Sequence, residues 1–245
     1  LGVDTTLLYR KEEILRGFDD DLRTMLHTEM EKKGVTIVTQ ANLKIIEQET
    51  KDRGRQVYKV TLSNGDIIET DLVMLAIGRH PNTEDLGLKR VGVETDDLGA
   101  IKVDSYSRSS VPNIYEVGDV TNRNNLTPVA IRDGAGFAET VFNNNAIAVD
   151  HAMVPTAVFS QPEIGTVGLT EAEAQAQYSV VDIYKSAFRP MKHTLSGRDE
   201  RAFMKLVVDG QTNRVLGVHL LGPDSGEMVQ LIAIPLKMGA TKAQF

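Results

Sequence analysis

The stretch NIYEVGDVTNRNNLTPVAIRDGAGFAETVF, residues 113–142, decides the fold of this chain. Residues 114–117 are β-rich and predict a short strand that ends at Gly118-Asp119. Thr127-Pro128 then predicts the start of a helix, with the threonine as N-cap and the proline as first helical residue. The backbone therefore passes from a sheet edge to a helix N-terminus, with a carboxylate at the turn.

That predicted geometry suits a cofactor. The free N–H groups of a first helical turn, and the dipole behind them, favour a group that gains negative charge, such as the N1/C2-carbonyl edge of a flavin on reduction. Asp119 offers acceptors to polyol hydroxyls such as those of ribitol. The alternative, from the residues alone, is an ordinary capped helix after a tight turn.

Composition limits the class of protein. The chain has 245 residues, of which 41% are hydrophobic and 25% charged, as expected for one large or two ordinary globular domains. Its net charge of −7 argues against a nucleic-acid partner. It contains neither a long apolar run nor a signal-like N-terminus, so we expect a cytoplasmic protein that does not bind membranes. Without cysteine, it has no disulfide, thiolate metal site or thiol nucleophile.

The N-terminal region suggests part of a dinucleotide-binding unit. Residues 3–9 form a β-rich run so close to the first position that we expect an upstream strand with its glycine-rich turn to be missing. The second strand of such a unit normally ends in an acidic residue that holds the ribose 2′-hydroxyl, whereas Arg10 stands here and Arg16 follows. Two guanidiniums on either side of a turn could bind one 2′-phosphate. Two solvated surface arginines are the alternative, and no GxGxxG motif decides between them.

A run of short elements follows. Residues 18–33 have the apolar spacing of an amphipathic helix. Residues 72–77 form a continuous apolar run that predicts a strand buried on both faces. This run ends in Gly78-Arg79, and a glycine at that point lets a ligand approach the backbone. Between the helix and this run, the pattern predicts strands over residues 35–39, 43–47, 57–62 and 67–69, with a hairpin turn at residues 63–66.

The character of the chain changes after Pro155. Helices over residues 171–178 and 227–238, with strands over 180–187, 202–208 and 215–221, predict a separate α+β domain. Pro235 should kink the last helix. No two histidines have metal-ligand spacing, so we predict no metal site. Glu171, Glu173 and residues 198–201 are interpreted as solvated faces.

Two motifs resemble those of the flavoprotein disulfide reductases: AIGRHPNT, residues 76–83, and VGDVTNRNNLTPVAI, residues 117–131. Glu116 departs from the resemblance, because that family usually has a small residue there. The resemblance implies that Arg10 and Arg16 select NADPH and that Gly78 and Arg79 contact both cofactors. It further implies that FAD is held by Gly118, Asp119, Leu126 and Thr127.

The resemblance also implies a fold class and a domain order. We expect α/β nucleotide-binding segments, partial, Rossmann-like and three-layered, followed by an α+β interface domain. Residues 1–82 would be the C-terminal part of the NADPH-binding domain, and residues 83–152 the second FAD-binding segment. Residues 153–245 would be a truncated dimerisation domain that forms a homodimer.

Within this family the motifs look like those of glutathione reductases of a bacterial or plant-like type. Such enzymes pass hydride from NADPH to FAD and then to a paired-cysteine disulfide, which reduces glutathione disulfide with the help of a His–Glu pair on the partner subunit. In that pattern the dithiol precedes residue 1 and the histidine follows Phe245. We therefore expect a partial chain that has no catalytic residue and is inactive as given.

Two other functions stay open. One is a trypanothione or dihydrolipoamide reductase segment, although Arg10 and Arg16 argue against an NAD-using dihydrolipoamide dehydrogenase. The other is a non-catalytic module for nucleotide binding or dimerisation, which the absence of cysteine favours if the chain is complete.

Overall fold

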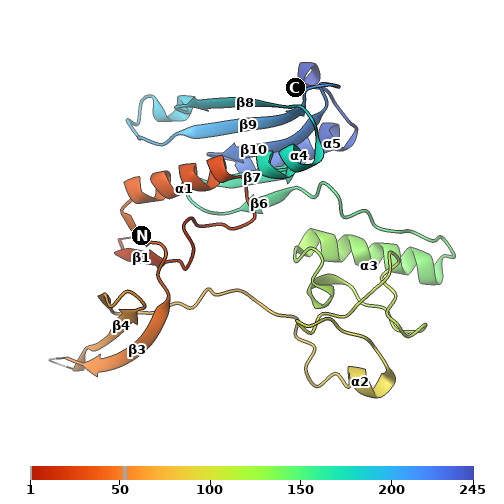
Figure 1. Ribbon diagram of the computed structural model, residues 1–245, viewed down its shortest axis with the longest axis horizontal. Helices are drawn as coiled ribbons and strands as arrows, with labels where there is room; N and C mark the ends of the chain where they lie inside the picture. Colours follow the sequence, from red (N-terminus) through yellow and green to blue (C-terminus); the bar gives the residue numbers. More distant parts are fainter. Residues whose placement is uncertain (1, 52–53) are drawn as a thin grey trace. The chain divides into compact units, whose positions relative to one another are not determined.

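The computed structural model describes residues 2–51 and 54–245, which form two compact units (Figure 1). The first unit joins the residues up to Val73 with Met153–Phe245. The second unit is the intervening segment, Met74–Ala152. The first unit therefore combines parts of the chain that are distant in sequence.

The first unit opens with a parallel βαβ element. Strand β1 (Thr5–Leu8) pairs in parallel with β2 (Val35–Val38), and helix α1 (Asp20–Lys32) connects them. Asp19 is the N-cap of α1, and its side chain accepts a hydrogen bond from the amide of Asp21 at 3.2 Å. The helix predicted over residues 18–33 and the strand predicted over residues 35–39 are confirmed.

A second, antiparallel sheet covers the β1–β2 pair. It contains β3 (Leu43–Thr50), β4 (Gln56–Leu62) and β5 (Ile67–Thr70) in that order. Leu8 and Val38 point to its core, whereas Leu7 and Ile37 point to the core under α1. Successive strand residues face opposite sides, so β1 and β2 form the middle of the three expected layers.

The prediction of a buried strand at residues 72–77 is wrong. The segment is not a strand, and Leu72 and Ile77 are 78% and 90% exposed. A strand exists only where a neighbour accepts and donates its backbone hydrogen bonds, and within residues 2–51 and 54–245 no segment pairs with this one.

The C-terminal part of the first unit is a five-stranded antiparallel sheet with helices on both faces. Helix α5 (Ser225–Lys237) packs on one face, and α1 shares a core with the other face (Figure 1). Helix α4 (Glu171–Gln177) lies on the same face of the sheet as α1, where it packs on Val207 and Leu216. The strand order is β6 (Thr156–Val158), β7 (Ile164–Gly168), β10 (Val215–Leu221), β9 (Ala202–Asp209) and β8 (Val181–Phe188). The α+β character predicted for this part of the chain is confirmed.

Helix α5 continues through Pro235 to Lys237. Proline removes the hydrogen bond that its own amide would donate. The next turn is nevertheless closed, because the Met238 amide donates to the Ile234 carbonyl at 3.1 Å and the Ala240 amide to the Pro235 carbonyl at 3.0 Å. The proline thus lies where the helix is about to end.

The second unit is built around helix α3 (Thr127–Phe142), which confirms the predicted helix. Two details differ from the prediction. The N-cap is Leu126, and Thr127 is already helical. The strand expected at residues 114–117 is reduced to one bridge between Arg108 and Tyr115, since no longer segment of the described chain lies alongside it.

The remaining helices of the second unit are short. Helix α2 (Leu88–Val91) is flanked by glycines at both ends, and the 3₁₀ helix η2 (Gly118–Thr121) precedes α3. Two further 3₁₀ helices, η3 (Met191–His193) and η4 (Lys242–Gln244), belong to the first unit.

Candidate functional site

The second unit brings together two of the sequence motifs. The guanidinium Nη1 of Arg79 lies 3.5 Å from Oδ2 of Asp119, and both side chains are exposed. Gly78 and Gly118 have φ values of 110° and 77°, which a residue with a side chain seldom adopts. Each charged residue therefore follows a turn that requires glycine, and the two turns meet.

The N-terminus of α3 lies beside the Asp119 turn, since α3 packs against η2. A Cβ added at Gly118 would come within 3.2 Å of the Ala130 Cβ, so glycine allows this close approach. The Leu126 carbonyl accepts from the Val129 and Ala130 amides at 3.0 Å each. The amide and hydroxyl of Thr127 have no partner in the described parts of the chain.

These features fit the flavin-type group that the sequence predicts. A free amide at a helix N-terminus binds an anionic or carbonyl edge, and an exposed carboxylate beside it accepts hydrogen bonds from hydroxyls. Gly78, Arg79, Gly118, Asp119, Leu126 and Thr127 all belong to this one region of the second unit. Their contacts with a cofactor remain a prediction.

A buried carboxylate fixes the loops around α3. Asp133 is 2% exposed, and it accepts from Arg123 Nη2 at 3.1 Å and from His151 Nε2 at 2.8 Å. Arg123 lies in the loop before α3, and His151 lies after the helix. Sequence reasoning missed this group, because a single aspartate on a helix gives no local signal of burial.

The first unit presents the two arginines predicted to bind a 2′-phosphate. Arg10 and Arg16 are both exposed, on the turn between β1 and α1. The turn itself is fixed: Arg23 of α1 donates from Nε to the Ile14 carbonyl at 2.7 Å and from Nη2 to the Glu13 carbonyl at 2.8 Å. The backbone that carries the two guanidiniums is thus held in place while their charges face solvent.

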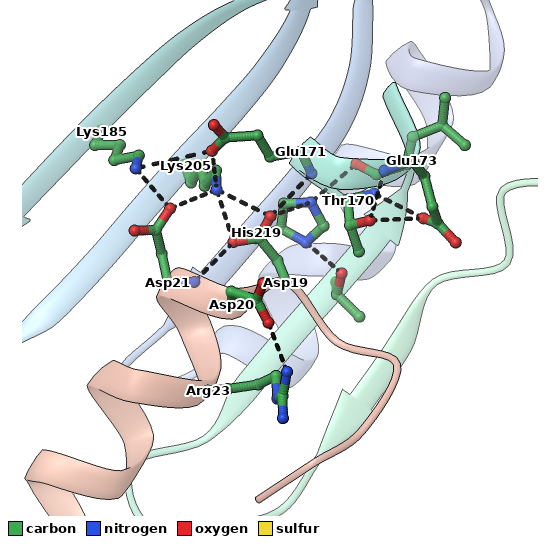
Figure 2. A network of polar contacts seen from close by, with 12 residues as sticks. Asp19, Asp20, Asp21, Arg23, Thr170, Glu171, Glu173, Lys185, Lys205 and His219 are labelled. Carbon is green, nitrogen blue, oxygen red and sulfur yellow. Dashed lines mark hydrogen bonds and ion pairs between the residues drawn. The ribbon is translucent and has the colours of Figure 1, made fainter. Parts of the chain in front are cut away.

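Figure 2 shows a polar network that the sequence did not reveal. The ammonium of Lys205, on β9, is 1% exposed and lies 2.7 Å from Asp19 Oδ1, 2.5 Å from Asp21 Oδ2 and 2.7 Å from Glu171 Oε2. Asp19 also accepts from the Glu171 amide at 3.0 Å. The interpretation of Glu171 as part of a solvated face is therefore wrong, because α4 directs its carboxylate at this buried cation.

The charges in this network stabilise one another. Burial opposes the charged form of Lys205, but hydrogen bonds to three carboxylates outweigh it and raise the lysine's pKa. Burial also opposes ionisation of Asp19, yet the Glu171 amide and Lys205 lower its pKa overall. Removing one partner of such a buried pair typically costs about 3–5 kcal/mol, since an unpaired charge is left behind.

His219 lies next to this network on β10 and is fully buried. Burial lowers its pKa, which favours the neutral ring. A neutral ring satisfies both nitrogens: Nε2 donates to the Leu169 carbonyl at 3.0 Å, and Nδ1 accepts from the Thr166 hydroxyl at 2.6 Å. The residue therefore has a structural role.

Comparison with known proteins assigns this architecture. The family model described as pyridine nucleotide-disulphide oxidoreductase matches residues 1–134. The chain belongs to the pyridine nucleotide-disulphide oxidoreductase family. The dimerisation domain of this family matches residues 154–245, the part that contains the five-stranded sheet.

Individual relatives in this family cover the whole chain. A glutathione reductase from Burkholderia cepacia is 52% identical over 245 residues, and a trypanothione reductase from Trypanosoma congolense is 44% identical over 246. Among solved structures, the HOCl-induced flavoprotein disulfide reductase RclA from Escherichia coli superposes with a TM-score of 0.87 at 25% identity, covering 99% of this chain and 55% of RclA. The chain spans about half the length of the curated relatives it matches, 54% and 49% for the two named.

Two further observations concern membranes and metals. Within the described ranges, no helix is both long enough and apolar enough to cross a bilayer. In the same ranges, no cluster of three or more histidine, aspartate or glutamate side chains has the geometry of a metal site.

Proposed function

We propose that this chain is part of a homodimeric, cytoplasmic, NADPH- and FAD-dependent reductase of glutathione disulfide. The observation that carries the proposal is the meeting of the Arg79–Asp119 pair with the open N-terminus of α3. The 52% identity to the Burkholderia cepacia glutathione reductase supports the choice of substrate. The division into residues 1–82, 83–152 and 153–245 belongs to the same proposal.

Each predicted site residue has a role in this proposal. Bound FAD would supply two-electron transfer between the nicotinamide and a disulfide. Asp119 would accept hydrogen bonds from the ribitol, beside Gly118. The free amide of Thr127 would face the pyrimidine edge, next to the N-cap Leu126, whose own amide donates to the Asn124 carbonyl at 2.8 Å. A negative charge at that helix N-terminus is favoured by about 0.3–2 kcal/mol. Gly78 and Arg79 would border both cofactors.

The arginine turn would select the dinucleotide. Arg10 and Arg16 would bind the 2′-phosphate that distinguishes NADPH from NADH, and a hydrogen bond to a charged group contributes about 1.5–3 kcal/mol. An acidic residue in place of these arginines, which is usual where the ribose carries a free 2′-hydroxyl, would repel the 2′-phosphate of NADPH.

Substituting Asp119 tests the flavin site. In the full-length protein, Asp119→Ala should lower the affinity for FAD roughly ten- to hundredfold, the equivalent of one charged hydrogen bond. The measurement is the flavin absorbance per polypeptide after purification, followed by FAD titration of the stripped protein. Asp97→Ala, at another exposed aspartate of the second unit, is the matched control. Equal flavin content and equal affinity for FAD in the wild type, Asp119→Ala and Asp97→Ala would contradict the proposal.

Trypanothione disulfide is the second candidate substrate. The 44% identity to the Trypanosoma congolense enzyme favours it over dihydrolipoamide. Rates of NADPH oxidation with glutathione disulfide and with trypanothione disulfide, at equal concentrations, separate the two. A protein that binds neither FAD nor NADPH would instead be a non-catalytic dimerisation module, and one that binds a nucleotide but reduces neither disulfide would be a non-catalytic nucleotide-binding module.

A further inference from the structure

A polar row crosses the face of the five-stranded sheet that looks towards α1. Lys185, Lys205, His219 and Thr166 lie side by side on β8, β9, β10 and β7, each directly opposite the next in the strand register. On one side of this row Phe203 and Leu221 pack against α1, and on the other side Val207 and Leu216 pack against α4. A buried cation within an apolar face is costly unless it has a dedicated partner.

That partner is the N-terminus of α1. Asp19, its N-cap, accepts two hydrogen bonds from the Lys205 ammonium at 2.7 and 2.9 Å, and Asp21 of the first turn accepts another (Figure 2). Glu171 of α4 lies 2.7 Å from the same ammonium. Asp19 and Lys205 are each 1% exposed in the side chain. The Asp19 carboxylate thus ends the turn before α1 and is one of the three carboxylates that pair with the buried lysine.

The other end of α1 is also held by the C-terminal part of the chain. Glu29 is 1% exposed and accepts from the Arg201 amide at 3.3 Å, while Lys33 pairs with Glu200 at 2.5 Å. With contacts at both ends, α1 has little freedom to slide or tilt on the sheet.

The position of α1 sets the position of the arginine turn. Arg16 precedes Asp19 by only three residues, and Arg23 of α1 binds two carbonyls of the same turn. Ile14, in the middle of the turn, is buried in the core that α1 shares with Phe203 of β9. A change at Lys205 would therefore reach the turn through Asp19 and through this core.

We propose that Lys205 is a positioning residue for dinucleotide selection: by fixing Asp19, it holds the Arg10–Arg16 turn in the geometry that binds a 2′-phosphate. This inference rests on the proposed function of the two arginines. Lys205 itself touches no dinucleotide in this proposal; the five-stranded sheet acts on coenzyme choice through the N-cap of α1 and the core that α1 shares with the turn.

The test measures binding of adenosine 2′,5′-bisphosphate and of 5′-AMP to the full-length holoprotein by calorimetry. The ratio of their affinities reports the 2′-phosphate contact alone. Lys205→Met should reduce this ratio about tenfold, a size typical of small displacements of binding groups. Lys205→Arg, which keeps the charge, should retain most of the ratio. Flavin content and oligomeric state should not change.

Lys185→Met is the matched control. Lys185 also contacts Asp21, at 2.7 Å, but its side chain is 43% exposed, so we expect the ratio to stay within about twofold of wild type. If Lys205→Met is insoluble, Asp19→Asn gives the same test, since asparagine keeps the N-cap but removes the charge facing Lys205. An unchanged ratio in a folded Lys205→Met or Asp19→Asn protein would overturn the inference.

Failure of the proposed function gives a different result. If the wild-type protein does not prefer adenosine 2′,5′-bisphosphate, and Arg10→Glu/Arg16→Glu binds both ligands as wild type does, the arginines do not read a 2′-phosphate. If the wild-type preference is present and lost in the double arginine variant, the function stands, and only the Lys205 variants decide the inference.

Discussion

At the scale of single residues, Glu116 is a carboxylate with no compensating partner. It is partly buried before the Gly118 turn, and no cation or donor pairs with its side chain in the described ranges. Burial alone raises its pKa above the ordinary value of 4.5. The fold therefore holds this carboxylate at a cost, because burial disfavours its charged form.

We expect Glu116→Gln to stabilise the protein near neutral pH. As pH rises through 4.5 the unfolded chain ionises Glu116 more readily than the folded protein, so the wild type loses stability that the glutamine variant keeps. The gain should be no more than about 0.5 kcal/mol, because solvent screens a partly exposed group. Urea unfolding at pH 4 and pH 7 measures it. A gain that is equal at both pH values would show that ionisation is not the cause.

At the scale of elements, the contact of α5 with the sheet depends on Gly165 of β7. A Cβ there would lie 2.3 Å from the Ser225 carbonyl oxygen and 2.9 Å from the Val229 Cβ, both in α5. Neither atom belongs to a flexible side-chain end. The helix therefore approaches β7 at a distance that only glycine allows.

Gly165→Ala should destabilise the protein by about 1–3 kcal/mol, since α5 must move away from the sheet. Gly226→Ala is the matched control in the same helix, because its Cβ would meet Ala157 and Phe159 at 3.4 Å, an ordinary contact. The control should change the free energy of unfolding by less than about 1 kcal/mol. Denaturant unfolding of both variants checks this, and equal values for the two would contradict the packing account.

At the scale of the whole molecule, one face of α5 remains uncovered. Leu231, Ile234 and Met238 are exposed at helical spacing, whereas Val229, Ala233 and Leu236 are buried against the sheet. Because this stripe lies in the part of the chain that matches a dimerisation domain, we expect it to contribute to a subunit contact.

We expect Leu231→Glu/Ile234→Glu to convert a dimer to a monomer, because two charges per subunit would be buried without partners. Sedimentation velocity of the full-length protein at about micromolar concentration measures the change. Ile67→Glu, at another exposed apolar residue of the first unit, should leave the dimer intact. If the double variant stays dimeric, another surface forms the interface.

The amino-acid sequence by itself determined most of the elements that form and the turns at which a cofactor site is predicted. Apolar spacing predicted α1, and the Thr127-Pro128 pair predicted the start of α3. The local sequence pattern also predicted α4, α5 and most strands, because such patterns are a local property of the chain. The Gly78-Arg79 and Gly118-Asp119 turns were found as motifs, and the structure shows that they meet. The apolar run at residues 72–77 led to a wrong prediction, because a local sequence pattern shows that a segment could form a strand but not whether another strand lies beside it.

Only the tertiary structure decided how these elements act on one another. Lys205 and Asp19 are 186 residues apart, and their contact follows from the strand register and from the docking of α1, neither of which leaves a local pattern. Glu171 stands at the start of a helix, where acidic residues are often solvated, and nothing in the sequence around Asp133 distinguishes it from an exposed aspartate. Their partners come from distant segments, so burial and pairing became visible only when the chain was folded.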